Sequence, residues 1–349
     1  MGVRAPKDGN RHGYDENRIL DTGSSKPKAP AKPTKKPQQV KSKRLPVAPK
    51  PSPELVASKE IINLFQQTFS AALENPMLHT LLQTVKGHLF NRDYTAAFGS
   101  DENLQGYIVR WSPSRALCYR SVFLDLTDLL RDVFETEQAK DKEIVCIGGG
   151  AGAELAAAAS ATKFLIPRDP EESKGKVVMT GIDVAAWGPV FDKLLGGIHN
   201  GFISEERFTA QFKQANILDV DLKTVIGRKT RLISYLFVTN ELYTESRAKT
   251  TKMFVELGSC VEKGCLLLVL ESAGSYSMVK VGDKEFSMGM LLDHTLLAGG
   301  EWEKVVEEES RWYRLPQAPV FNGQVIGTGL RYPLQLENMR YFVRVFRKL

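Results

Sequence analysis

The chain has 349 residues, enough for one large domain with appendages or for two small ones. Its hydrophobic content of 42% and charged content of 25% are ordinary for a soluble globular protein, and no apolar run approaches the roughly 20 residues that a membrane helix needs. The four cysteines form no C-x-x-C pair and the histidines are scattered, so the sequence suggests neither a metal site nor a thioredoxin-like motif.

The first 53 residues carry the basic character of the chain. They hold 13 Lys and Arg against four Asp and Glu, a net charge of +9, whereas the remainder has a net charge of −3. Because this stretch is rich in Pro, Lys and Ser and has almost nothing to bury, it predicts a disordered tail over residues 1–53. Its clusters KPTKK and KSKR are typical of nucleic-acid-binding arms and nuclear import signals, with a plain solubilising tail as the alternative.

A helical extension is expected over residues 54–140. Apolar residues at helical spacing predict one helix from Glu54 to Pro76 and a second over 77–93. A third helix is expected over 112–135, with Ser112 as its N-cap and the following proline at its first position.

Strands and helices alternate from residue 143 onward. The pattern predicts helices at 153–162, 187–200 and 246–264, and strands at 143–149, 176–183, 208–218, 231–243, 265–274, 301–316 and 339–349. Apolar and polar residues alternate along the last two strands, which indicates an antiparallel edge of the sheet. The segment 141–349 is therefore predicted to be a doubly wound α/β domain.

The run CIGGGAGAE, residues 146–154, lies between the first of these strands and the helix that follows it. Glycine at 148, 149, 150 and 152 lets the backbone turn sharply and lets a ligand lie against it. The run also fits G-x-G-x-x-A, so by itself it leaves open NAD, S-adenosylmethionine or a tight turn without any ligand.

Polar residues at the next two strand ends narrow the choice of ligand. Asp183 ends the second strand, where an acid is placed to bond ribose hydroxyls. The third strand ends in Asn216, Ile217 and Asp219, where an adenine edge would be read. Together with Glu154 directly after the glycines, and with no second catalytic domain downstream, this pattern favours S-adenosylmethionine over a nicotinamide cofactor.

Five segments resemble those of a known enzyme family. They are YIVRWSPSRALCYRSVF (107–123), IVCIGGGAGAEL (144–155), GIDVAAW (181–187), QANILD (214–219) and FVTNELY (237–243). Over about residues 60–349 the chain resembles the fungal 25S ribosomal RNA uridine-N3 methyltransferases, which have a Rossmann-like seven-stranded sheet and use S-adenosylmethionine. RWSPSRALCYR is the most specific of the matching stretches.

The resemblance implies an enzyme of the nucleus or nucleolus, with the cytoplasm as the alternative, that methylates one uridine in ribosomal RNA or a pre-ribosomal particle. It implies no membrane partner. Carried onto this chain, it implies cofactor contacts from Gly148, Gly149, Gly150, Gly152, Glu154, Asp183, Val184, Asn216, Ile217 and Asp219.

The segment TNELY, residues 239–243, is expected at the carboxyl end of the sheet, where substrates enter. Uridine N3 must lose a weakly acidic proton, and Glu241 is the candidate base. Asn240 is the candidate to hold a uracil carbonyl, and Tyr243 to stack on the ring. Alternatively, Asn240 and Glu241 cap the helix that follows. The loop has no cysteine, which excludes it as the source of the thiolate that pyrimidine C5 methylation needs.

A basic and aromatic cluster precedes the sheet and consists of Arg110, Trp111, Arg115, Tyr119 and Arg120. Such a mixture suits RNA phosphates and base stacking, and equally the carboxylate of the methionine moiety. The alternative is a structural helix that turns Trp111 and Tyr119 inward.

The sequence alone leaves two further questions open. Trp187 either flanks the adenine or packs in the core. The whole chain is either a methyltransferase, with another RNA or a protein as alternative targets, or an S-adenosylmethionine-binding assembly factor without catalysis.

Overall fold

The computed structural model describes residues 52–134, 141–165, 175–274, 278–281, 283–318, 320–321, 324–325 and 328–349. The predicted tail therefore lies outside the described residues, except for its last two positions. Ser52 caps helix α1 (Pro53–Thr68), because its hydroxyl accepts a 3.1 Å hydrogen bond from the Leu55 N–H. Pro53 occupies the first helical position, where its missing N–H costs nothing.

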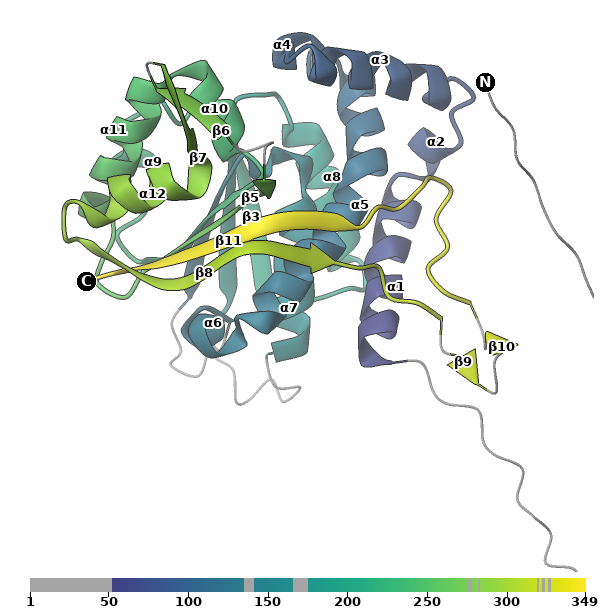
Figure 1. Ribbon diagram of the computed structural model, residues 1–349. Coiled ribbons are helices and arrows are strands. Elements are labelled where there is room, and N and C mark those ends of the chain that lie inside the picture. The colour runs from purple at the N-terminus through teal and green to yellow at the C-terminus, as the bar shows by residue number, and fades with distance from the viewer. Residues whose placement is uncertain are drawn as a thin grey trace, which may run out of the picture. The chain divides into compact units, whose positions relative to one another are not determined.

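Seven strands form one sheet in the order β3-β2-β1-β4-β5-β11-β8 (Figure 1). Their bounds are β1 Lys142–Ile147, β2 Val177–Asp183, β3 Phe208–Gln214, β4 Thr230–Leu236, β5 Leu266–Ser272, β8 Trp302–Tyr313 and β11 Met339–Lys348. Strands β1 to β5 are parallel, and β11 runs antiparallel between β5 and β8. This confirms the doubly wound sheet with an antiparallel edge. The strand order reverses between β1 and β4, so the ligand-binding switch point lies at their carboxyl ends.

Helices cover both faces of the sheet. Those before and between the strands are α2 Ser70–Leu73, α3 Leu78–Phe90, α4 Tyr94–Ala97, α5 Asp101–Asp125, α6 Thr127–Phe134, α7 Ala153–Leu165, α8 Gly188–His199, α9 Leu222–Val225, α10 Thr239–Glu245, α11 Arg247–Leu257 and α12 Met288–Leu297. Two small ladders, β6 Met278–Val281 with β7 Lys284–Ser287 and β9 Val320–Phe321 with β10 Gln324–Val325, lie outside the main sheet.

Alternate residues of the strands supply two hydrophobic cores. Cys146 of β1 packs in the core that α1, α3, α5, α7 and α8 complete, whereas its neighbours Val145 and Ile147 pack in the core of α9 to α12. This is the period of two expected for a strand buried on both faces. The helical extension and the sheet share the first of these cores.

The third predicted helix begins at the wrong place. Instead of beginning at Ser112, α5 begins after Ser100, whose hydroxyl accepts from the Asn103 N–H at 3.2 Å, and it continues through Pro113. A proline inside a helix leaves the carbonyl four residues earlier without its N–H donor. Here a segment far along the chain supplies another donor to that carbonyl, so the helix survives. Ser112 instead donates to the Ala151 carbonyl at 2.7 Å and ties α5 to the glycine run.

The predicted strand 231–243 is also too long. Strand β4 ends at Leu236, and α10 begins at Thr239. Between them Phe237 has a φ of 61°, in the left-handed region that bulky residues rarely adopt. The apolar run continues through this turn, so the sequence pattern does not reveal where the strand ends.

Candidate active site

The glycine run makes a tight turn between β1 and α7. Gly148 and Gly152 both have a φ of 74°, which favours glycine. A Cβ at Gly148 would lie 2.6 Å from a methyl group of Val238, and one at Gly152 would lie 2.6 Å from a methyl group of Leu194. The run is therefore held in this shape by both its backbone conformation and its neighbours.

Asp183 lies beside the glycine run at the end of β2. Its carboxylate accepts from the Gly150 N–H at 3.3 Å and from the Ala185 N–H at 3.1 Å. Burial raises the pKa of Asp183 to about 6, and hydrogen bonds to the carboxylate act in the opposite direction. The next side chain, Val184, is 60% exposed. A fixed carboxylate next to an exposed apolar side chain suits a ribose joined to an adenine.

Trp187 packs in the core rather than facing solvent. It is 2% exposed, and its ring lies 5.3 Å from that of Phe98 and 5.6 Å from that of Tyr107, centroid to centroid. A Cβ at Gly150 would lie 2.1 Å from its indole. Gly150 is therefore needed for the close packing of Trp187 on the turn, and packing is the interpretation that the structure supports for this residue.

The residues predicted to read adenine lie at the end of β3, next to Asp183, whose carbonyl accepts from the Ala215 N–H at 2.8 Å. The Asn216 amide donates to Asp219 at 3.0 Å and to Glu245 at 2.8 Å. Asp219 also pairs with a lysine of α11, and Ile217 is 5% exposed in the second core. The polar groups of this turn thus form one local network at the same sheet edge as the ribose acid.

Two carboxyl groups at the switch point, those of Glu154 and Glu241, interact electrostatically with the guanidinium of Arg115. Arg115 of α5 lies over the rings of Tyr107 and Phe237, at 5.6 and 5.9 Å from their centroids. Burial raises the pKa of Glu154 to about 8 and that of Glu241 to about 7, while Arg115 lowers both. Asp183 raises both through its negative charge. The site thus carries more acidic than basic groups.

This charge balance allows a test of whether S-adenosylmethionine fits. The cofactor has a sulfonium and an ammonium, two positive charges, against a single carboxylate. Acids in a poorly solvated site are stabilised by cations placed beside them. Glu154 and Asp183 therefore suit the cationic cofactor, and Arg115 suits its carboxylate. The residues present fit the group.

Glu271 was missed by the sequence interpretation. This acid of β5 is 2% exposed and accepts from the Thr239 hydroxyl at 2.9 Å and from the Asn240 N–H at 3.2 Å. It thereby caps α10, so Asn240 and Glu241 are not themselves the cap of that helix. The sequence signal that could have found Glu271 is an acid at the end of a very apolar strand. Such an acid lies near the site because the carboxyl ends of parallel strands meet at one edge of the sheet.

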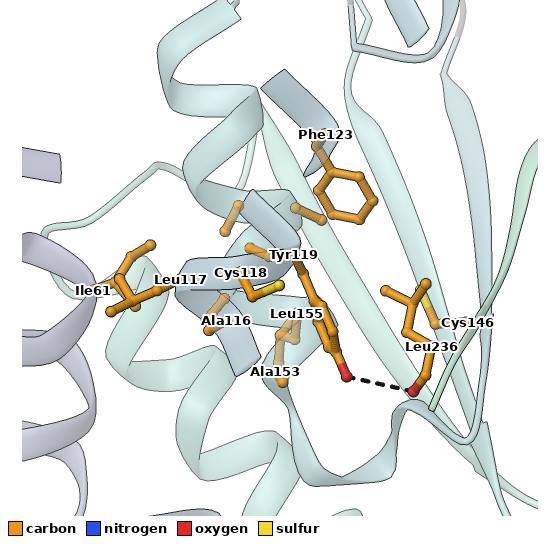
Figure 2. Packing of buried hydrophobic residues seen from close by; sticks show 14 of the residues in the cluster. Ile61, Ala116, Leu117, Cys118, Tyr119, Phe123, Cys146, Ala153, Leu155 and Leu236 are labelled. Carbon is orange, nitrogen blue, oxygen red and sulfur yellow. Dashed lines mark hydrogen bonds between the residues drawn. The ribbon is translucent and has the colours of Figure 1, made fainter. Parts of the chain in front are cut away.

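Two tyrosines assigned to the substrate lie in the core. Tyr243 is 6% exposed and stacks on Phe254 at 6.4 Å. Tyr119 is 1% exposed, and its hydroxyl donates to the Leu236 carbonyl at 3.4 Å, as the dashed line in Figure 2 shows. No nucleobase has access to either ring in this structure, which corrects the expected stacking roles of both.

Of the remaining members of the basic and aromatic cluster, Arg110 and Trp111 are partly exposed at the rim of the site and Arg120 is buried in the core. Arg110 pairs with Glu337 and donates to the Gln335 carbonyl at 3.0 Å. The half-buried ring of Trp111 packs on that of Tyr107 at 4.8 Å. Arg120 is 1% exposed and bonds to α1 and α7. Arg120 therefore holds helices together.

Neither a membrane helix nor a metal cluster is found where the structure describes the chain. No helix of the described ranges is long and apolar enough to cross a bilayer. Among the same residues, no group of three or more His, Cys, Asp or Glu side chains is arranged to hold a metal ion.

The sheet order, the glycine turn after β1 and the acid at the end of β2 define a Rossmann-like enzyme class that binds a nucleotide-containing cofactor. Comparison with known proteins makes this specific. A family profile described as "Putative SAM-dependent methyltransferase" matches residues 65–347, and the chain belongs to this S-adenosylmethionine-dependent family.

A curated relative and two solved structures are similar to the chain. The Saccharomyces cerevisiae protein named 25S rRNA (uridine(2843)-N(3))-methyltransferase is 35% identical over 325 residues, which cover 83% of this chain and 85% of that protein. A methyltransferase structure from Methanosarcina mazei is 13% identical, covers 63% of this chain and 97% of its own, and has a TM-score of 0.38. One from Clostridium acetobutylicum is 11% identical, covers 66% and 90%, and has a TM-score of 0.36.

Proposed function

We propose that this protein transfers a methyl group from S-adenosylmethionine to N3 of a uridine in large-subunit ribosomal RNA. The observation that carries the proposal is the 35% identity, over most of both chains, to a relative named for this reaction. The site supports it, because a carboxyl group with a pKa near neutrality lies at the sheet edge where substrates enter.

The cofactor site that we propose runs along the carboxyl ends of β1, β2 and β3. The methionine part would lie on the glycine turn, with its ammonium at Glu154 and its carboxylate at Arg115. Asp183 would bond the ribose, and Val184 would lie against the adenine. The turn formed by Asn216, Ile217 and Asp219 would read the adenine edge. When bound, the cofactor supplies an electrophilic methyl group on sulfur.

Glu241 is the proposed general base. It would take the N3 proton as the nitrogen lone pair forms its bond to the methyl carbon and the carbon–sulfur bond breaks. A base with a pKa of about 7 is partly ionised at neutral pH and still basic enough to accept a proton. The side-chain amide of Asn240, one residue earlier on α10, would hold a uracil carbonyl and so orient N3.

The rest of the chain has supporting roles in this proposal. Residues 141–349 would form the methyltransferase domain. Residues 54–140 would complete its cofactor site by supplying Arg115. Arg110 and Trp111 at the rim would contact RNA. The basic residues of 1–53 would add non-specific affinity for RNA and direct the protein to the nucleus or nucleolus.

The test is nucleoside mass spectrometry of large-subunit ribosomal RNA from cells that lack the protein. We expect 3-methyluridine to fall, to return with the wild-type protein, and to stay low with Asp183→Ala. Undiminished 3-methyluridine would contradict the proposal. Full restoration by Asp183→Ala would instead favour an assembly factor whose catalysis is not needed.

A further inference from the structure

Strand β8 ends in an exposed tryptophan that has two arginines close to its ring. Trp312 is 53% exposed. The guanidinium of Arg314 lies 5.4 Å from its ring centroid and that of Arg340 lies 6.0 Å away. Both arginines are exposed. These three residues are called the Trp312 patch.

Strand register explains why the three side chains meet. Trp312 is paired with Arg340 across the β8–β11 ladder, and Figure 1 shows these strands side by side. Arg314 follows two residues after Trp312, the spacing that returns a side chain to the same face. Arg311 points to the other face, where it pairs with Asp125.

Within the part of the chain that the structure describes, the charges of the patch have no acidic partner. Over the described ranges, no carboxylate lies within ion-pair distance of Arg314 or Arg340, whereas the neighbouring Arg311 pairs with Asp125 and Glu308. The Arg340 guanidinium donates to the Ser310 hydroxyl at 2.9 Å, which holds it beside the indole. Two free positive charges and one aromatic face suit a polyanion that carries planar rings.

The patch lies at the same edge of the sheet as the proposed base. Across the three strands β5, β11 and β8, Ser272 is paired with Tyr341, and Tyr341 with Arg311. Ser272 follows the Glu271 that caps α10. From the end of β4, which precedes the helix of the proposed base, the order β4-β5-β11-β8 gives three strand spacings or about 15 Å, so the patch lies about two nucleotides away along this end of the sheet.

A hollow of about 270 Å³ is lined in part by Glu54, Arg311, Tyr313 and Tyr341, mostly from the other face of these strands, as well as by Trp312 and Arg314. Because the Glu54 side chain adds a carboxylate to its lining, the hollow is not counted as part of the Trp312 patch. The apolar surface of the patch itself is one ring between charged groups, unlike the apolar centre of a protein–protein interface.

We propose that the Trp312 patch binds a single-stranded segment of the RNA substrate next to the target nucleotide. A base would stack on the exposed indole, and Arg314 and Arg340 would contact the flanking phosphates. The inference rests on the proposed function, because RNA must be the substrate. It adds a second contact surface, formed by the antiparallel edge strands, outside the cofactor site.

The experiment uses the full-length protein, cofactor and large-subunit ribosomal RNA, with methyl transfer as the readout. Base–aromatic stacking has an effect of about tenfold or more, so we expect Trp312→Ala to raise KM for RNA about tenfold with little change in kcat, and Trp312→Phe to retain most of the affinity. Arg314→Gln with Arg340→Gln should make the slope of log affinity against log salt less steep by about 1.4, because each contact to a single-strand phosphate contributes about 0.7.

Two controls separate the patch from general electrostatics. Arg228→Gln removes an exposed charge just before β4, at the opposite edge of the sheet, and should change KM little. A U-rich single-stranded oligonucleotide containing 4-thiouridine is crosslinked to the protein, and the crosslinked peptides are identified by mass spectrometry. We expect crosslinks to the peptide that contains Trp312.

The outcomes distinguish the two proposals. If the wild-type protein methylates the RNA but the patch variants have an unchanged KM, or if crosslinks occur only in the first 53 residues, the patch inference is wrong and the proposed function stands. If Arg228→Gln weakens binding as much as the patch variants do, the patch inference is also wrong. If the wild-type protein neither methylates nor crosslinks RNA, both fail.

Discussion

The hydroxyl of Tyr332 donates a 2.7 Å hydrogen bond to the carbonyl of Val109, the group that Pro113 leaves without a helical donor. The two partners are 223 residues apart in the chain. Val109 is fully buried, so the Tyr332 hydroxyl takes the place of the helical donor that its carbonyl lacks.

Removing the Tyr332 hydroxyl should destabilise the protein by an amount that depends on whether Pro113 is present. Tyr332→Phe should lower the free energy of unfolding by about 1–3 kcal/mol, because it leaves a buried carbonyl unsatisfied. Urea unfolding measures the change. In a Pro113→Ala background the helix regains its own N–H donor, so the same substitution should cost clearly less. An equal cost in both backgrounds would contradict this account.

Two adjacent glycines of α8 should respond to alanine in opposite directions. At Gly196 nothing lies within 4 Å of the added Cβ, so Gly196→Ala should raise the free energy of unfolding by about 0.5–1 kcal/mol through helix propensity. At Gly197 the Cβ would lie 2.3 Å from the Thr68 hydroxyl of α1, so Gly197→Ala should destabilise by about 1–3 kcal/mol. Thermal unfolding of both variants checks the prediction, and stabilisation by both would refute the close approach of α8 to α1.

Cofactor binding should release a proton from Glu154. Burial holds the pKa of this group at about 8, so it is mostly protonated at pH 7, and a cation bound beside it favours the ionised form. We expect release of close to one proton at pH 7. At pH 9 the carboxylate is already ionised, so the release should give way to uptake, because the α-amino group of the free ligand is then largely neutral and binds as the ammonium. Calorimetry of S-adenosylmethionine binding in buffers with different ionisation enthalpies measures this.

Glu154→Gln is the matched variant for that measurement. It should weaken binding and remove most of the proton release at pH 7. Proton uptake by the wild type at pH 7, or unchanged release in the variant, would show that the ammonium does not lie at Glu154.

The rate of methyl transfer should follow the ionisation of Glu241. Its pKa in the folded protein is raised to about 7, so the group is protonated and inactive as a base below that pH. We expect kcat to rise with pH through about 7 and then level off; this rise is the acid limb of the pH profile. Glu241→Gln should lower kcat by about 10²–10⁴-fold and abolish the limb. Single-turnover rates from pH 5.5 to 9 measure both effects.

Glu256→Gln serves as the control for this profile. This glutamate lies exposed on α11 and pairs only with Lys252 among the described residues, so its substitution should leave the limb in place. Persistence of the limb in Glu241→Gln would assign it to another group.

Local patterns in the sequence determined the sheet and indicated where the proposed cofactor residues lie. Parallel strands are short apolar runs, and their carboxyl ends meet at one edge, so an acid or a glycine turn at the end of such a run has a predictable place. The positions of Gly150, Glu154 and Asp183 follow from this rule, as does that of Glu241 after β4.

Only the tertiary structure decided which side chains are free to act. Tyr119 and Tyr243 have the residue type of stacking platforms, yet packing turns both into the core. Trp312 is exposed at the end of an edge strand of the folded sheet, and Pro113 fits within a helix because a distant hydroxyl replaces the missing donor. Exposure and hydrogen-bond satisfaction depend on segments far apart in the chain, and no local spacing encodes them.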